Sequence, residues 1–302
     1  MLMNLTAKNL KAVPSKNTSG PDTLEGKIIS MHPVIAGDVF YWDRGVWDEK
    51  LSREIQEARA VILPQTVERE LYCLCKKLCP FVFPNYDLRF KWEGKVGDTL
   101  AFWAFNIKHP QTLIFPRVET LLGDHPDMDL KVPELPRFPF VLKGARGGEG
   151  AQVWLIKSST ELQERMQTLL QFELKGSSGF VIQEYLPELE RDLRVVVIGN
   201  RVVSYWRKAS GFLHNIAKGG EVDADSDPDL QAVGREKVRQ FCHRSGINLA
   251  AFDLVFPSGE AEPFFLEINY TFGRTGLGGS ANFYKLLQHA VKQWLQDTLQ
   301  SK

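Results

Sequence analysis

The chain has 302 residues, of which 43% are hydrophobic, so it is long enough to bury one or two substantial cores. Its 37 basic and 37 acidic residues give a formal net charge of zero, and this balance argues against nucleic acid or a membrane surface as a partner. No apolar run approaches the roughly 18 residues that a transmembrane helix needs, and the polar amino end lacks a secretory hydrophobic stretch, so we expect a cytoplasmic protein.

The first 90 residues predict a mobile segment followed by a small α/β unit. Residues 1–25 are rich in polar residues and proline, which is typical of a mobile terminus. The pattern then predicts strands near 27–30, at 40–42 and at 60–63, a helix over 48–59, a second helix over 66–79 and an extended segment at 81–83.

Three cysteines in the second helix raise the question of a metal site. Cys73, Cys75 and Cys79 lie in one run, but only Cys75 and Cys79 share a helix face, and the fourth cysteine, Cys242, is far along the chain. Reduced, partly buried thiols are the favoured interpretation, with a zinc site as the alternative.

A lysine followed by a glycine-rich loop comes next. Residues 138–143 predict a buried strand that ends in Lys143, and a second strand is predicted over 151–156. Glycines in the loop between them let backbone N–H groups approach phosphate oxygens, and these are Gly144, Gly147, Gly148 and Gly150. The loop therefore indicates a flap over phosphate; a glycine-rich hairpin without catalytic importance is the alternative.

Further strands and helices follow along the chain. A strand is predicted over 180–187, and residues 192–198 and 201–207 predict a hairpin with the two-residue turn Gly199-Asn200. Asp227 and Pro228 indicate the start of a helix that Gly246 can end, and a last helix is predicted over about 282–299.

Acidic residues in two apolar strands suggest a metal site. If residues 249–256 and 264–269 form a hairpin with Phe256 opposite Phe264, Asp253 faces Glu267, and Asn269 lies on the same face. The other face, with Leu254, Leu266 and Ile268, should point into a core. Oxygen ligands without Cys or His suit a hard cation such as Mg²⁺; the alternative is a half-exposed hairpin whose acids meet water.

The order and spacing of these motifs resemble the ATP-grasp superfamily, most closely the RimK-like ligases that join a carboxylate to an amine. The resemblance covers residues 91–299 and rests on Lys95, the Lys143 loop, residues 183–186, Asp192-Leu-Arg194, Arg207, Asn215 and the Asp253 and Glu267 strands. It implies an α/β protein with α+β lobes: an ATP-grasp fold in which two lobes, over 91–187 and 188–302, enclose the nucleotide. Residues 26–90 would form a small, reduced α/β pre-grasp domain.

The resemblance also implies roles for individual residues. ATP phosphates would be bound by Lys95, Lys143 and the flap glycines Gly147, Gly148 and Gly150, and adenine by Gln183, Glu184, Tyr185 and Leu186. Asp192 would contact the nucleotide near the ribose, although a solvated strand-end aspartate is the alternative. Arg207, Lys143 and Asn215 would form the catalytic set, and Asp253, Glu267 and Asn269 would bind Mg²⁺, with Mn²⁺ as a substitute.

The chain departs from the family pattern at several positions. Gly94 replaces an aspartate before Lys95, and Leu213 replaces an arginine that usually contacts nucleotide, which leaves that contact in doubt. The longer loop over 270–280 contains Arg274, a candidate for binding an acceptor carboxylate or phosphate, with a solvated loop arginine as the alternative. His214 is a second candidate for a substrate contact.

The implied reaction is attack of a carboxylate on the γ-phosphate of MgATP, followed by attack of an amine on the acyl phosphate. The substrates would be a peptide, a protein terminus or an amino-acid-like metabolite. Such chemistry depends on positioning and charge neutralisation, which agrees with the predominance of lysine, arginine and carboxylate among the candidates. Two alternatives remain open: a nucleotide-binding regulatory protein without turnover, and an ATP-grasp kinase.

Overall fold

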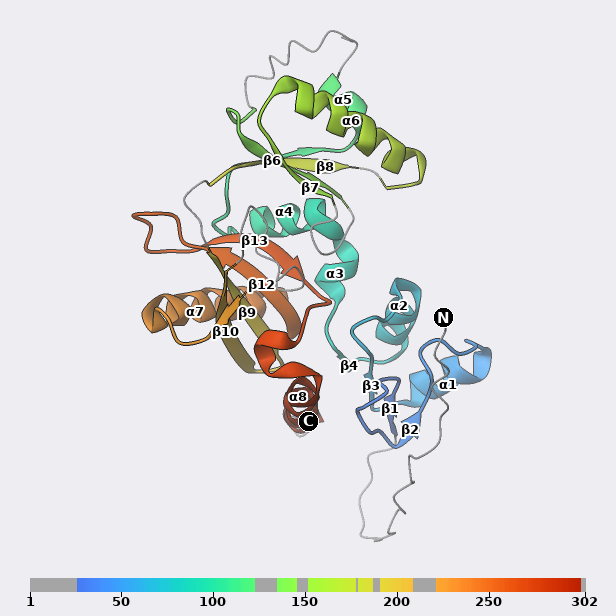
Figure 1. Ribbon diagram of the computed structural model, residues 1–302. Coiled ribbons are helices and arrows are strands. Elements are labelled where there is room, and N and C mark those ends of the chain that lie inside the picture. Colours follow the sequence, from blue (N-terminus) through green and yellow to red (C-terminus); the bar gives the residue numbers. More distant parts are fainter. Residues whose placement is uncertain are drawn as a thin grey trace, which may run out of the picture.

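The computed structural model describes residues 26–122, 135–145, 152–177, 179–186, 191–208 and 221–299, which form three β-sheets and the helices packed on them (Figure 1). One sheet lies in the amino-terminal part, one in the upper lobe of the figure and one in the centre. None of the helices within these ranges combines the length and apolar character that a bilayer crossing requires.

The amino-terminal sheet is parallel, with the order β2-β1-β3-β4. Its strands are β1 (Ile28–Ser30), β2 (Val39–Phe40), β3 (Ala60–Ile62) and β4 (Val82–Phe83), and its helices are α1 (Glu49–Glu57) and α2 (Arg69–Leu78). The Asp48 carboxylate caps α1 by accepting a hydrogen bond from the Leu51 N–H at 2.8 Å. The strands and helices predicted for this part are confirmed, each somewhat shorter than predicted.

The sheet of the upper lobe is antiparallel, with the order β5-β8-β6-β7. Helices α3 (Asp87–Lys91) and α4 (Gly94–Ala104) lead to β5 (Thr112–Phe115) and α5 (Val118–Leu122). Then follow β6 (Phe140–Gly144), β7 (Val153–Ile156), α6 (Ser159–Leu174) and β8 (Phe180–Glu184). The predicted strands on both sides of the Lys143 loop are confirmed and pair with each other.

The central sheet has the order β11-β10-β9-β12-β13. Its strands are β9 (Arg191–Ile198), β10 (Arg201–Lys208), β11 (Glu221–Asp223), β12 (Leu249–Val255) and β13 (Phe264–Asn269). The predicted hairpin is confirmed, because Ile198 pairs with Arg201 and Gly199 takes the positive φ of 60° that a tight turn uses. Helix α7 (Pro228–Ser245) begins and ends as predicted, with Gly246 at φ 76°, and η2 (Thr275–Leu277) precedes α8 (Gly279–Leu299).

The β12–β13 hairpin differs from prediction in its register. Asp253 does face Glu267, but Val255 rather than Phe256 faces Phe264, because the register shifts by one residue between Asp253 and Leu254. The extra residue is Leu266, which is only half-buried, whereas Phe265 is 2% exposed. The prediction that Leu266 points into the core is therefore wrong: the β-bulge turns the larger Phe265 inward in its place.

Both faces of the central sheet are covered. Along β9, Val195 and Val197 pack in a core with α4 and α7, while Val196 and Ile198 pack in a core with α8 and the amino-terminal domain. Two-sided burial explains why residues 195–198 of β9 and 249–252 of β12 are continuous apolar runs rather than alternating ones. The upper lobe has its own core around Phe180.

Gly199 gives a test of how α8 packs on the hairpin turn. A Cβ at Gly199 would lie 2.9 Å from Ala290 Cβ, whereas one at Gly259, where φ is also positive, would meet nothing within 4 Å. Both Gly199→Ala and Gly259→Ala should lose about 1–2 kcal/mol from the left-handed backbone, and Gly199→Ala about 1–3 kcal/mol more from overpacking. Urea unfolding measures the difference, and equal losses would contradict this packing.

Candidate active site

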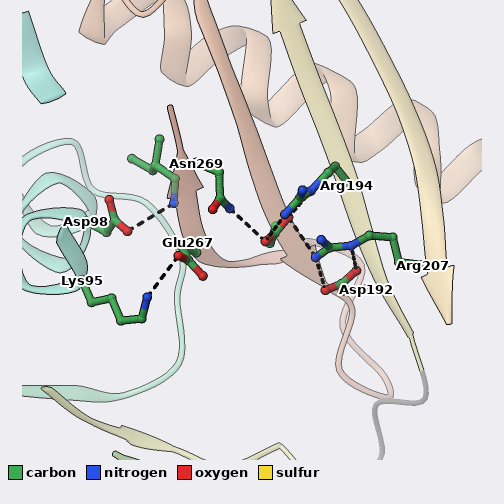
Figure 2. A network of polar contacts seen from close by, with 9 residues as sticks. Lys95, Asp98, Asp192, Arg194, Arg207, Glu267 and Asn269 are labelled. Carbon is green, nitrogen blue, oxygen red and sulfur yellow. Dashed lines mark hydrogen bonds and ion pairs between the residues drawn. The ribbon is translucent and has the colours of Figure 1, made fainter. Parts of the chain in front are cut away.

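The candidate site lies where the central sheet meets helix α4 and the upper lobe (Figure 2). Side chains from five elements converge there, and Figure 2 shows most of them in one row between α4 and β10. They are Lys95 and Asp98 from α4, Asp192 and Arg194 from β9, Arg207 from β10, Asp253 from β12, and Glu267 and Asn269 from β13.

Asp253 is the centre of a buried ion-pair network. Its oxygens accept hydrogen bonds from Arg194 Nε and Nη2 at 2.8 and 2.7 Å, and Arg207 Nη2 lies 3.0 Å from Oδ1. The Asn269 amide nitrogen donates to Oδ2 at 3.0 Å. Burial disfavours the charged carboxylate, but the two guanidinium groups outweigh it and hold the pKa of Asp253 well below its usual range.

Arg207 is held in a fixed orientation by Asp192, its cross-strand partner. Arg207 Nε and Nη2 donate to the two Asp192 oxygens at 2.7 and 2.5 Å, and both side chains are buried. Burial opposes the charge on Arg207, yet Asp253 and Asp192 raise its pKa above the ordinary value. Nη1 has no hydrogen-bond partner among the described residues, so two N–H donors of a rigid, permanently charged group remain for an anion.

Two oxygen atoms on β13 fit a hard cation. Glu267 Oε1 accepts from Lys95 Nζ at 3.2 Å, which leaves Oε2 open, and Asn269 turns its nitrogen to Asp253, which leaves Oδ1 open. Neither open oxygen has a hydrogen-bond partner within the described residues. An amide and a carboxylate oxygen on one strand face are ligands that suit Mg²⁺. The oxygens of Asp253, in contrast, are already engaged by arginine.

Two lysines from different elements interact with Glu267. Lys95 is 7% exposed near the start of α4, and its N–H donates to the Ala145 carbonyl at 3.1 Å, which ties α4 to the end of β6. Lys143 lies on β6, two residues before Ala145; burial lowers its pKa to about 8, although Glu267 favours its charge. The predicted pair of phosphate-binding lysines therefore lies beside the predicted metal ligand.

Asp98 adds a carboxyl group that the sequence analysis did not include. It lies on α4 one turn after Lys95 and accepts a hydrogen bond from the Ile268 N–H at 3.3 Å. Burial, and then the nearby charge of Glu267, raise the pKa of Asp98 to about 8. At neutral pH this carboxyl is therefore largely protonated.

The predicted adenine-binding segment runs along and beyond β8. Gln183 is buried and its amide donates to Thr112 Oγ1 at 2.9 Å, while Glu184 is exposed and accepts from the Gln111 N–H at 3.3 Å. Phe140 and Glu184 form the last pair of the ladder, so Tyr185 and Leu186 lie past its end and are half-buried. The role of this segment stays a prediction.

Other predicted residues lie apart from this row or outside the described residues. Arg274 follows β13 and faces the amino-terminal domain, where it donates to Gln65 Oε1 at 3.4 Å. The predicted residues that fall outside the described ranges are Gly147, Gly148, Gly150, Leu213, His214 and Asn215. Within the described ranges there is no group of three His, Cys, Asp or Glu placed for a metal ion, so the zinc alternative for the cysteines finds no support.

Like Asp98, Arg194 was not predicted to belong to the site, although the sequence pattern places it there. Arg194 belongs to the quoted motif Asp192-Leu-Arg194, and period-two alternation places both charged residues on one face of β9. Pairing of β9 with β12 sets Arg194 opposite Asp253. Asp98 had a weaker signal, since recognising it required a helix at 94–104.

The chain is similar to known ATP-grasp proteins. The model of the RimK-like ATP-grasp domain matches residues 104–281. A probable alpha-L-glutamate ligase of Pectobacterium carotovorum subsp. carotovorum (strain PC1) is 26% identical over 149 residues, 48% of this chain and 46% of that protein. Beta-citrylglutamate synthase B of Danio rerio is 27% identical over 121 residues, 39% of this chain and 28% of that protein. The chain thus spans less than half the length of either curated relative.

A solved structure supports the same fold. The D-alanine-D-alanine ligase of Bacillus anthracis complexed with ATP superposes with a TM-score of 0.60 at 15% identity, over 87% of both chains. At this identity the likeness concerns the fold alone, and it confirms the predicted ATP-grasp architecture.

The raised pKa of Asp98 predicts a pH-dependent effect on stability. The unfolded carboxyl ionises near pH 4 and the folded one near pH 8, so the folded state holds an extra proton between these values and loses stability as pH rises through them. Asp98→Asn, which mimics the protonated group, should raise the free energy of unfolding by at least about 1 kcal/mol at pH 8.5 and by little at pH 4.5. Urea unfolding at both pH values measures this, with the exposed Asp225→Asn as control. Equal effects at both pH values would contradict the burial of a protonated Asp98.

Proposed function

This chain belongs to the RimK-like ATP-grasp family, and we propose that it is an ATP- and Mg²⁺-dependent ligase that joins a carboxylate to an amine and releases ADP and phosphate. The observation that carries the proposal is the convergence of Lys95 and Lys143 with the open oxygens of Glu267 and Asn269. Cations that suit phosphate oxygens and ligands that suit Mg²⁺ are both needed to bind and polarise a nucleotide triphosphate.

The reaction would proceed in two steps. An oxygen of the donor carboxylate attacks the γ-phosphorus of ATP, forming an acyl phosphate as the bond to ADP breaks. The amine then attacks the acyl carbon, the amide bond forms, and phosphate leaves with the electron pair of the broken C–O bond, while the amine loses a proton. Neither step requires a nucleophile from the protein, so the residues act through position and charge.

The lysines and the buried arginine of the candidate site have distinct roles in this scheme. Lys95 and Lys143 would contact the phosphates. The Nη1 group of Arg207, which has no hydrogen-bond partner among the described residues, would donate to the oxygens of the transferring phosphoryl group. The preorganised pair with Asp192 spares Arg207 from reorienting during the reaction. Bound Mg²⁺ would supply charge neutralisation to the phosphates.

We infer that Glu267 and Asn269 hold the ion with their open oxygens. Asp253 would join them only by exchanging a guanidinium contact for the cation, because its oxygens already accept from Arg194, Arg207 and Asn269. The residues at 183–186 would line the adenine pocket, and a cytoplasmic location remains part of this proposal.

ADP release tests the function directly. Wild-type protein is incubated with MgATP and pools of carboxylates, each with and without a pool of amines. A ligase should release ADP only when both are present. ADP release that needs a second substrate but no amine would indicate a kinase, and ATP binding without turnover would indicate a regulatory protein.

Glu267→Gln tests the proposed metal site. The variant keeps the shape but loses the charge that faces the ion, so the tightening of ATP binding by Mg²⁺ should vanish and turnover should fall at least about a hundredfold. Calorimetric titration with a non-hydrolysable ATP analogue, with and without Mg²⁺, measures the first effect.

Glu262→Gln is the matched control for this variant. Glu262 lies in the loop beyond the β12–β13 ladder and forms an exposed ion pair with Lys237, and exposed pairs of this kind contribute little to stability. Its Mg²⁺ dependence should remain that of the wild type. Loss of Mg²⁺ dependence in Glu262→Gln but not in Glu267→Gln would overturn the assignment.

A further inference from the structure

Residues 94–108 cover the outer edge of β13, the last strand of the central sheet. Within the described residues β13 pairs only with β12, and its other edge meets α4 and the segment after it. The Phe265 N–H donates to the Lys108 carbonyl at 2.9 Å, and the Ile268 N–H donates to Asp98 Oδ2 at 3.3 Å. An edge strand otherwise leaves such N–H groups without partners. Asp98 therefore takes the place that a neighbouring strand would have.

Asp98 reaches β13 between the two proposed metal ligands (Figure 2). Ile268 lies between Glu267 and Asn269, and its N–H belongs to the planar peptide unit that starts at the Glu267 carbonyl. A hydrogen bond from this N–H to Asp98 therefore restrains the backbone that carries the Glu267 side chain. Asn269 is restrained separately, by its hydrogen bond to Asp253. The two contacts together fix both ends of the short segment that presents the open oxygens.

Helix α4 contacts this segment through two of its side chains. Lys95 Nζ donates to Glu267 Oε1 at 3.2 Å, and Asp98, three positions after Lys95, accepts from the next residue of β13. Residues three apart lie on one face of a helix. Lys95 and Asp98 are both buried, each 7% exposed. One helix face thus holds the Glu267 carboxylate and the peptide unit that follows it.

The position of α4 is itself fixed by close packing. A Cβ at Gly97 would lie 2.3 Å from the carbonyl carbon and oxygen of Trp92, so the first turn approaches the preceding chain more closely than any other residue type allows. One turn further along, the Phe102 ring lies 5.9 Å from the ring of Phe265 in β13. The Asp98 carboxyl therefore comes from a rigid helix, which holds a functional group more precisely than a loop does.

We propose that Asp98 is a positioning residue for the cation site, which holds Glu267 and Asn269 at the spacing that Mg²⁺ needs without touching the ion itself. The proposal rests on the proposed function, which supplies the ion and the nucleotide. Groups outside the set of direct ligands control metal affinity by orienting those ligands. The Lys95 N–H also donates to the Ala145 carbonyl just after β6. Helix α4 therefore sets the metal ligands and the phosphate-binding lysines relative to each other.

Amide hydrogen exchange of the metal-free full chain, followed by NMR, gives the first test. Asp98→Leu keeps the side-chain shape but removes the acceptor, so the Ile268 amide should exchange at least about tenfold faster, as expected for the loss of one buried hydrogen bond. Asp98→Asn keeps an oxygen acceptor and should leave this rate near that of the wild type. The Phe265 amide, bonded to Lys108, is the internal reference and should not change in either variant. An unchanged Ile268 rate in Asp98→Leu would contradict the proposed contact.

Binding of Mn²⁺ in the presence of a non-hydrolysable ATP analogue gives the second test, with the ion observed by electron paramagnetic resonance. Asp98→Leu should weaken Mn²⁺ binding by about 10- to 100-fold, the range typical for loss of a group that orients a metal ligand. Asp98→Asn should recover the affinity of the wild type. Binding of the analogue without metal should be the same in all three proteins. Asp98→Ala, which removes the acceptor with less bulk, should behave as Asp98→Leu in both tests.

Thr99→Val is the matched control for Asp98→Leu. Thr99 is the next residue on α4, is 4% exposed and donates from Oγ1 to the Lys95 carbonyl at 3.0 Å. The variant therefore loses a buried side-chain hydrogen bond of the same helix without removing an acceptor from β13. The exchange rate of the Ile268 amide and the affinity for Mn²⁺ should both remain those of the wild type.

The outcomes separate the role of Asp98 from the proposed function. If the wild type with the ATP analogue takes up no Mn²⁺, the metal site is refuted and the role of Asp98 with it. If Glu267→Gln loses Mn²⁺ while Asp98→Leu keeps the wild-type affinity, the metal site stands and Asp98 has no part in it. Equal losses in Asp98→Leu and Thr99→Val, or no recovery in Asp98→Asn, also refute the positioning role, because packing of the helix would then account for the effect.

Discussion

Two arginines and two aspartates buried between β9, β10 and β12 form the interaction on which the rest of the site depends. Removing such charges from water costs several kcal/mol each, and only close pairing with opposite charges offsets this cost. The pairs Arg207–Asp192 and Arg194–Asp253 are cross-strand neighbours, so they form in only one register. A slip of one residue would place each charge on the opposite, apolar face. The network therefore specifies how three strands align, and with them the proposed catalytic Arg207.

Asp253 also fixes the position of the residues on β13. Glu267 remains opposite Asp253 although the bulge shifts the rest of the hairpin, and Asn269 is oriented by its hydrogen bond to the same carboxylate. Lys95 from α4 and Lys143 from β6 lie beside Glu267. Positive groups for phosphate and oxygen ligands for a cation thus lie next to each other, which neither the central sheet nor the upper lobe achieves alone.

The amino-terminal sheet and the central sheet share one hydrophobic core. Residues of β1, β3 and α2 pack in one cluster with Val196, Ile198 and α8, and Gln65 donates to the Tyr270 carbonyl just after β13. This packing brings the strand ends of the parallel sheet to the loop with Arg274. The amino-terminal part therefore supplies His32 and Gln65 to the wall of a cleft that Arg274 also lines.

Local rules were enough to predict the β9–β10 turn, the limits of α7 and the position of Asp253 opposite Glu267 from the sequence. The Asp192–Arg207 pair could also have been predicted, because a turn that sets Ile198 opposite Arg201 sets Asp192 opposite Arg207. The β-bulge could not be predicted, because Phe265 and Leu266 are both apolar. Only the packing of Phe265 against Phe241 and Phe252 places Phe265 rather than Leu266 in the core. Long-range folding, in contrast, sets Lys95 beside Glu267, 172 positions away, and buries Asp98 against the Ile268 N–H, because contacts between distant segments leave no periodic trace in the sequence.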